Sequence, residues 1–254
     1  MGQPKMKKNQ KKNNAKVSYK KSGSGALTSK GAWKSIAVEI EAESPLHLNS
    51  GRANVNIDSD IVHDAFGIPY FPAKRLRGLL YESAVELWEM MEGTNKEFSS
   101  QLIEELFNRT ENSPVQMMIH DFYLAAGADY QKMADGWAYL SEKYPEIITQ
   151  ESVLKQYTST RFRTRIDPET GTAADMSLRN VRVLDAGTKF YGKIELLGAN
   201  EQHRALLELA LCNLTRAGMN RNRGLGHIRC CSDAKKKGNP DVANMLKKLR
   251  EVNQ

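Results

Sequence analysis

Three carboxylates and two histidines stand in or beside a polar segment in the first quarter of the chain, where they could transfer protons or hold a metal ion. The carboxylates are Asp58, Asp60 and Asp64, and the histidines are His47 and His63. A carboxylate can accept a proton or bind Mg²⁺, and an imidazole can act as acid or base, with a purely structural role as its alternative. Segment 49–60 has no apolar periodicity, and an irregular loop of this length in a compact domain is functional or disordered.

A basic cluster follows this loop. Lys74, Arg75 and Arg77 fall in the first turn of an expected helix, where the helix dipole favours acidic residues instead. Basic residues placed there at a local cost indicate a nearby anion such as a phosphate. The alternative is three solvated charges.

A second basic cluster lies in an extended segment. Arg161, Arg163 and Arg165 alternate along the chain, and this spacing puts all three side chains on one face of a strand. Like charges in a row repel one another, so the pattern favours contact with a polyanion.

The third basic cluster is interleaved with glycine. Arg221 and Arg223 precede Gly224 and Gly226, shortly before the last expected strand. Glycine permits a positive φ and close backbone approach, and guanidinium groups bind phosphates in a bidentate manner. The segment therefore suits phosphate contacts, although it is not a Walker motif, because no Gly-Lys-Ser/Thr follows.

These clusters need a mixed scaffold of strands and helices. Alternating apolar and acidic residues predict a strand over 36–42, and helical spacing predicts a helix over 73–91. The remaining expected elements are a rigid turn at 67–72, a helix over 97–107, a buried strand over 115–124, a mostly helical stretch over 125–157 with a break at Pro145, a β-hairpin over 181–196, a helix over 204–214 and a last strand near Cys230.

Charge divides the 254-residue chain into an arm and a body. Residues 1–34 contain ten lysines and no acid, and removing them from the +7 total leaves 27 basic and 30 acidic residues, a net charge of −3. The body must therefore bind any nucleic acid through local patches. We expect a disordered basic arm over 1–34, which either lies on nucleic acid or solubilises the chain, a folded domain over 35–232 with a helical insertion at about 94–157, and a polar tail over 233–254 with a short helix.

The composition favours a cytoplasmic protein. No apolar run approaches ~18 residues, which predicts that no segment spans a membrane, and the N-terminus lacks an apolar signal region. The three cysteines include an adjacent pair and lack both a disulfide framework and zinc spacing, which fits a reducing setting.

Taken in order, the motifs resemble those of the RAMP superfamily, the RRM-like proteins that build CRISPR effector complexes, and the match is similar to backbone subunits of type III complexes. The residues that carry the resemblance are Leu46-His47, Asp58, Pro69-Tyr70-Phe71-Pro72, Leu76-Arg77-Gly78, Arg161 to Arg165, Thr170-Gly171-Thr172-Ala173, Gly187-Thr188-Lys189-Phe190 and Arg221 to Gly226. The turn departs from the family's commoner Pro-Gly-Ser-Ser, since Pro72-Ala73-Lys74-Arg75 stands here.

The resemblance implies an α+β fold with a ferredoxin-like (RRM-like) antiparallel-sheet core, a thumb hairpin and helical insertions. It implies partners as well: a guide (CRISPR) RNA, a target RNA and other RAMP subunits. In target-cleaving members an Asp in the first loop is needed for cutting, which assigns Asp58 as the catalytic residue and as a ligand of a Mg²⁺ cofactor. Asp60 and Asp64 are the alternatives, and Asp58 ranks first only because of the resemblance.

Four functions remain open on the sequence alone. The first is a guide-binding subunit that cleaves guide-paired target RNA, with the three basic clusters on RNA. The second is a scaffold of the same complex in which Asp58 is only a solvated carboxylate. The third is a guide-processing endonuclease acting through His, Tyr or Lys. The last is an unrelated RRM-type module, for which the aromatic stacking signature is absent.

Overall fold

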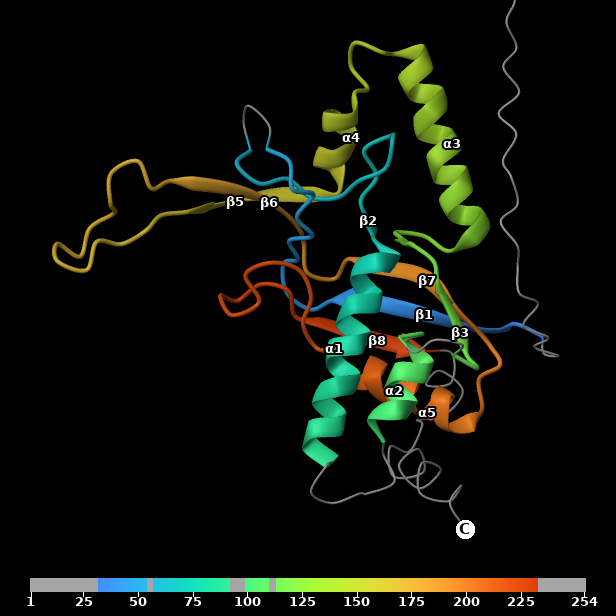
Figure 1. Ribbon diagram of the computed structural model, residues 1–254. Coiled ribbons are helices and arrows are strands. Elements are labelled where there is room, and N and C mark those ends of the chain that lie inside the picture. Colours follow the sequence, from blue (N-terminus) through green and yellow to red (C-terminus); the bar gives the residue numbers. More distant parts are fainter. Residues whose placement is uncertain (1–31, 54–56, 92–98, 110–112, 233–254) are drawn as a thin grey trace, which may run out of the picture.

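The computed structural model describes residues 32–53, 57–91, 99–109 and 113–232 (Figure 1). The chain runs through strands and helices in the order β1 Lys34–Ala42, β2 Tyr70–Phe71, α1 Ala73–Met91, α2 Ser100–Leu106, β3 Gln116–Ile119, β4 Phe122–Tyr123, α3 Gly127–Lys143, α4 Gln150–Gln156, β5 Thr158–Arg163, β6 Arg179–Leu184, β7 Lys189–Leu197, α5 Glu201–Asn213 and β8 Ile228–Ser232. The predicted basic arm, apart from its last residues, and the predicted C-terminal helix lie outside the described residues.

The main sheet is antiparallel and is built around β1. Strand β1 pairs with β7 on one side and with β8 on the other. Beyond β7 the strand order continues through β4 to β2, and β3 also pairs with β7. Along β1, Ile36, Val38, Ile40 and Ala42 are buried, as the apolar and acidic alternation predicts. The α+β fold with an antiparallel-sheet core is confirmed.

Helices α1, α2 and α5 cover one face of this sheet (Figure 1), and the main core lies between them. The long helix over 73–91 is present with the predicted bounds. It begins at Ala73, whose backbone N–H donates to the Asp121 carboxylate at 2.7 Å. Burial of Leu76, Leu79 and Leu80 fixes the face of α1 that packs inward.

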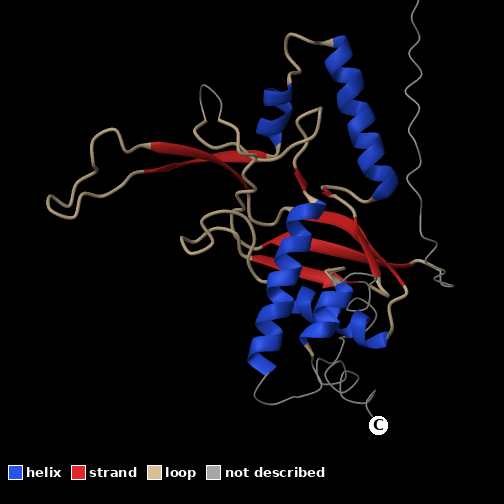
Figure 2. Cartoon of the chain, in the orientation of Figure 1, coloured by secondary structure: helices blue, strands red, loops and turns tan. Residues whose placement is uncertain are grey.

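Strands β5 and β6 form a separate two-stranded hairpin that projects from the body (Figures 1 and 2). The predicted hairpin over 181–196 is wrong, because β6 pairs with β5 whereas β7 pairs with β1. The turn between β6 and β7 is bound to β1 instead: Gly187 N–H donates to the Ala42 carbonyl at 2.7 Å. A short turn that favours a hairpin by sequence thus carries the chain from one sheet to the other.

Helices α3 and α4 pack around a small second core formed by Ile68, Ala134 and Val153. They match the helical stretch predicted over 125–157, and α3 ends at Lys143, before Pro145. The strand predicted over 115–124 is present as β3 and β4 of the main sheet, within the segment that was predicted as a helical insertion at about 94–157. No helix in the described ranges has both the length and the apolar character needed to cross a membrane.

Candidate nucleic-acid interface

Of the three loop carboxylates, only Asp58 belongs to a residue that is exposed to solvent. Asp60 is buried, and its Oδ1 accepts from the Arg182 Nε at 2.8 Å and the Ile61 backbone N–H at 2.8 Å. Asp64 accepts from the Phe66 and Ile68 backbone N–H groups and from the Tyr130 hydroxyl. Asp58 has a side chain 42% exposed to solvent. The geometry therefore favours Asp58 over its two alternatives, independently of any resemblance.

Asp58 is oriented by the start of β6. Its Oδ2 accepts from the Asn180 backbone N–H at 2.8 Å, and its own N–H donates to the Asn180 backbone and side-chain oxygens at 3.1 and 2.7 Å. Its Oδ1 lies 3.6 Å from Arg179 Nη1. The carboxylate is therefore held against the start of β6 and still reaches solvent.

Arginines from two of the basic clusters meet beside Asp58. A hollow of about 620 Å³ lies between the hairpin and the loop that precedes β8, and we call it the arginine hollow. Its lining consists of Arg163, Thr164, Arg165, Asp175, Met176, Ser177, Arg179, Val181, Asn220 and Arg223. Arg163, Arg165 and Arg223 were predicted to bind RNA, and the fold brings them together.

Cross-strand pairing concentrates positive charge in this hollow. Arg163 lies directly opposite Arg179 in the β5–β6 register, and like charges in directly opposed positions destabilise a sheet. Arg179 was missed by sequence reasoning, because its role depends on a strand pairing that was not foreseen. Arg161 lies on β5 and does not line the hollow, and Arg165 follows the end of β5 instead of continuing the strand as predicted.

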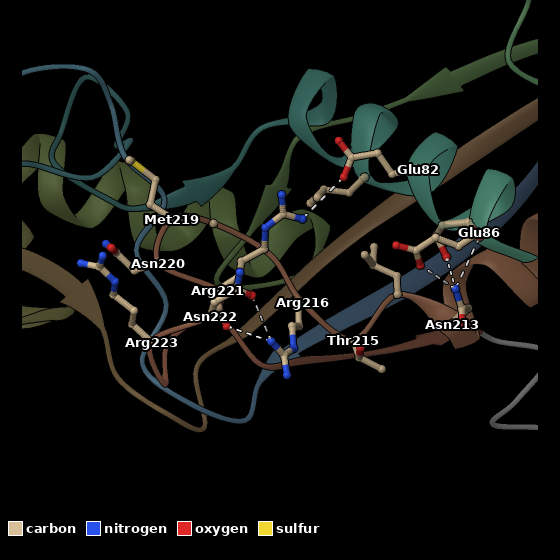
Figure 3. A pocket seen from close by; sticks show the side chains of 14 residues that line it. Glu82, Glu86, Asn213, Thr215, Arg216, Met219, Asn220, Arg221, Asn222 and Arg223 are labelled. Atoms are coloured by element: carbon tan, nitrogen blue, oxygen red, sulfur yellow. Dashed lines mark hydrogen bonds and ion pairs between the residues drawn. The ribbon is translucent and has the colours of Figure 1, made fainter.

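The glycine-rich loop lies on the other side of the arginine hollow and also borders a larger groove of about 760 Å³ against α1 (Figure 3). In this groove Arg221 Nη1 is 3.5 Å from Glu82, and Arg216 donates to the Arg221 carbonyl at 3.1 Å. Gly226 has a φ of +79°, and a Cβ there would lie 2.0 Å from the Ala217 carbonyl oxygen. Gly226 therefore has a structural reason to be glycine, and Gly224 has one as well, because it is exposed but has a φ of +78°.

The basic start of α1 is used partly by the protein itself. Arg75 donates to the Asn49 carbonyl at 2.7 Å, and Arg77 donates to the Met117 and Phe107 carbonyls at 3.0 and 2.6 Å. Burial lowers the pKa of the Arg75 guanidinium and that of the Arg77 guanidinium from their ordinary values. The anion at the helix start is Asp121, and among the three basic residues Lys74 is exposed.

A buried arginine beneath the site was not predicted. Arg182 on β6 is 2% exposed, and it donates to Asp60 at 2.8 Å and to Glu151 of α4 at 2.7 Å. Its backbone carbonyl accepts from His47 Nδ1 at 2.6 Å. This network ties the first loop, the β5–β6 hairpin and α4 to one another, so it fixes the position from which Asp58 projects.

His47 and His63 occupy structural positions. His47 is 1% exposed and lies between the Arg182 carbonyl and the Ser59 hydroxyl, 2.9 Å from its Nε2. His63 donates from Nδ1 to the Asp64 carbonyl at 2.8 Å. Burial lowers the pKa of His47, as do the nearby Arg163 and Arg75, against the opposing effects of the Arg182 carbonyl and Asp60. The imidazole is therefore neutral in the folded protein at pH 7.

Because the pKa of His47 is lower in the folded than in the unfolded chain, the unfolded chain takes up a proton first as the pH falls. The stability contributed by neutral His47 is thus present above its unfolded pKa of about 6.5 and is lost below it, by at most about 1.4 kcal/mol per pH unit. We expect His47→Asn, which keeps a donor near Nδ1, to lose less stability than the wild type between pH 7.5 and 5.5. Urea unfolding at both pH values measures this, and equal losses would contradict it.

The chemistry of a loop carboxylate fits one ligand position of a magnesium ion. Mg²⁺ usually takes one or two carboxylates together with phosphate oxygens and waters. Within the described ranges no three His, Cys, Asp or Glu side chains form a group that could hold a metal ion. Asp58 could supply one carboxylate oxygen to such an ion.

Comparison with known proteins gives the class of this fold. The model of the RAMP superfamily matches residues 39–229, which is most of the chain, and the protein belongs to that superfamily. No curated protein is significantly similar to the chain.

Two cryo-EM structures of the type III-B Cmr-beta complex contain chains of similar fold. In the one bound to cognate target RNA, the similar chain has a TM-score of 0.53 and 14% identity, over 84% of this chain and 98% of that chain. In the structure of the apo state, the similar chain has a TM-score of 0.54 and 15% identity, over 82% of this chain and 98% of that chain. At 14% and 15% sequence identity, these comparisons show a similar fold and nothing more specific.

Proposed function

We propose that this protein is a guide-RNA-binding backbone subunit of a type III CRISPR effector and that it cleaves target RNA paired with the guide. The observation that carries the proposal is the arginine hollow with Asp58 at its edge. The opposed arginines in this hollow favour contact with a polyanion, and Asp58 is the loop carboxylate that is exposed to solvent beside them. Base pairing between guide and target would select the target sequence, while the protein binds the RNA backbone.

Asp58 would act on the 2′-hydroxyl that lies next to the scissile phosphate. As a general base it would accept the hydroxyl proton while the 2′ oxygen bonds to phosphorus, and the bond to the 5′ oxygen breaks as that oxygen takes a proton from water. A bound Mg²⁺ would instead neutralise charge on the phosphate. Arg179 and Arg163 lie where they could contact the phosphate oxygens, and the Asn180 N–H would keep the carboxylate in orientation.

The projecting hairpin would act as the thumb that separates bases and displaces a nucleotide. Four large apolar side chains on the hairpin and on the segment joining its strands are more than half exposed: Phe162, Ile166, Met176 and Leu178. Apolar side chains inserted between base steps unstack them. A displaced nucleotide could rotate its 2′-hydroxyl into line with the next phosphorus, as the cutting step requires.

Removing positive charge from the arginine hollow is expected to weaken the binding of RNA whatever the nucleotide sequence of that RNA. We expect the double variant Arg163→Ala with Arg223→Ala to raise the Kd for single-stranded RNA about tenfold or more, because phosphate contacts are lost. Each lost contact should also lower the salt slope, which is the change of log K with log salt concentration, by about 0.7. Fluorescence anisotropy with labelled RNA at several salt concentrations measures both quantities. Lys132→Ala on α3, whose side chain lines neither hollow nor groove described here, is the control, and an effect equal to that control would contradict the placement.

A scaffold without nuclease activity is the second candidate, and one observation favours it. The Asp58 carboxylate already accepts the Asn180 N–H and pairs with Arg179, so it could serve only to fix the loop on the hairpin. Replacing Asp58 in the assembled guide complex separates the two, since a scaffold would still bind RNA and its complex would cut as before.

A further inference from the structure

A pocket of about 460 Å³ lies on the face of the main sheet opposite α1, α2 and α5, and we call it the tyrosine pocket. Ala37 and Glu39 of β1 line it, and they alternate along the strand with Val38 and Ile40, whose side chains are buried in the main core. The pocket shares no residue with the arginine hollow or with the groove at α1. Its volume falls in the range of small-molecule sites.

Three tyrosine side chains give this pocket a mostly apolar wall. Tyr123 and Tyr191 are direct partners in the β4–β7 register. The ring of Tyr130, on the first turn of α3, stacks on the ring of Tyr123 with the two centroids 4.0 Å apart. Tyrosine rings can pack against an alkyl chain, and their faces attract cations.

Two carboxylates interrupt the apolar wall. Glu39 has a side chain that is 16% exposed and lies 3.0 Å from the Lys189 Nζ. Asp121 Oδ1 accepts from the Ala73 backbone N–H at 2.7 Å, whereas its Oδ2 accepts no hydrogen bond from the residues that the structure describes. Asp121 can therefore offer one oxygen to a donor group in the pocket.

The positive groups at the tyrosine pocket are each opposed by a carboxylate. The Lys193 Nζ lies 2.8 Å from one oxygen of Glu195, and the His120 Nε2 lies 2.7 Å from the other. Helix α3 begins beside the pocket, and Asp129 in its first turn partly offsets the positive end of the helix dipole. These groups therefore do not make the pocket an anion site.

The pKa values of two lining tyrosines indicate the sign of the local potential. Burial has the largest effect on the pKa of Tyr123 and raises it, and the charges of Asp121 and Asp64 raise it further. Burial also raises the pKa of Tyr130, and so does its hydrogen bond to Asp64. Since the charges that act on both hydroxyls are negative, the pocket favours a cation over an anion.

We propose that the tyrosine pocket binds an organic cation, in which an ammonium group is joined to a short alkyl chain. The ammonium group would donate to Asp121 Oδ2 and be attracted by Glu39, while the alkyl chain would pack against the tyrosine rings. A free polyamine and a lysine side chain of a polypeptide both present this chemistry. The inference goes beyond the proposed function and does not rest on it, because that function uses no residue of this pocket.

The test is isothermal titration calorimetry of the full chain with spermidine. We expect saturable one-site binding by the wild type. Asp121→Asn keeps an oxygen for the Ala73 N–H and should weaken binding about tenfold, because hydrogen bonds to a charged acceptor are the stronger ones. Tyr191→Val keeps a good strand former and should weaken binding about threefold or more.

Glu142→Gln is the matched control, because Glu142 is an exposed carboxylate of α3 that does not line the pocket; it should bind like the wild type. Equal spermidine affinity in the wild type, Asp121→Asn and Tyr191→Val would overturn the proposal. So would butanediol binding as tightly as spermidine, or inorganic phosphate binding in place of spermidine. RNA affinity should be unchanged in these variants, which separates this test from that of the proposed function.

The two sources of the ammonium group are distinguished by a second titration, with Nα-acetyl-lysine amide. Tighter binding of spermidine would assign the pocket to a free polyamine. Tighter binding of the lysine derivative would assign it to a lysine side chain of a polypeptide. Absence of saturable binding for both probes would overturn the proposal.

Discussion

Arg182→Met is expected to destabilise the protein by about 3–5 kcal/mol. The substitution removes the guanidinium group that binds Asp60 and Glu151 and leaves Asp60 buried without its cation. Breaking a buried ion pair from one side has a cost in this range, because the remaining charge keeps its desolvation penalty. Urea unfolding at pH 7.5 measures the change, and the loss should appear as a lower midpoint.

Two variants show whether the loss comes from the orphaned charge. Arg179→Met removes an arginine from the same strand whose side chain is 68% exposed, and exposed ion pairs contribute about 1 kcal/mol or less. Asp60→Asn added to Arg182→Met keeps an acceptor for the Ile61 N–H and should recover part of the stability. If Arg182→Met costs no more than Arg179→Met, the network does not hold the loop as we infer.

The sequence was sufficient to predict elements whose side-chain period is set by one buried face. Strand β1 alternates buried and exposed residues along its length, and α1 buries Leu76, Leu79, Leu80 and Ala84 at helical spacing. Both elements gain stability by placing an apolar face on one shared core, so the local pattern and the fold agree. The predicted α+β fold and the family follow from such elements and from the order of the motifs.

Strand partners and buried charges could not be predicted in the same way. A close pair of strand-like segments around Gly187 favours a hairpin, yet each strand pairs with a segment more distant in sequence. Arg182 lies within a run that alternates with valine, and nothing local to that run shows that the guanidinium meets Asp60 and Glu151. Tertiary contacts alone decide both outcomes.

The candidate site was predicted in its residue types and only partly in its grouping. Arg163, Arg165 and Arg223 do meet, but Arg161 lies outside the arginine hollow and Arg179 completes it. Arg77 satisfies backbone carbonyls of two other segments, which a count of basic residues does not reveal. Asp58 could be separated from Asp60 and Asp64 only once their hydrogen-bond partners were known.

Asp58→Ala is expected to slow cleavage of guide-paired target RNA by at least about 100-fold, since a positioned general base contributes about 10²–10⁴ to the rate. Binding of guide and target should stay within about twofold, because the arginines of the hollow remain. Asp175→Ala, which removes the carboxylate that lines the arginine hollow, is the matched control and should leave the rate unchanged.

Asp58→Asn refines this prediction. The amide oxygen can still accept the Asn180 N–H, so the loop should keep its conformation and its RNA affinity. The amide cannot accept a proton from the 2′-hydroxyl and is a poorer ligand for Mg²⁺ than a carboxylate. A loss of cutting as large as that of Asp58→Ala would show that the negative charge, and not the loop geometry, carries the chemistry.

The most direct measurement of the central claim is the single-turnover rate of target-RNA cleavage by the assembled guide complex with Mg²⁺, comparing the wild type with Asp58→Asn at saturating target. The proposed function predicts cuts by the wild type within the guide-paired region and a rate at least about 100-fold lower for Asp58→Asn, with target binding retained. Cuts that persist at the wild-type rate would contradict the claim and leave this subunit as a holder of guide and target.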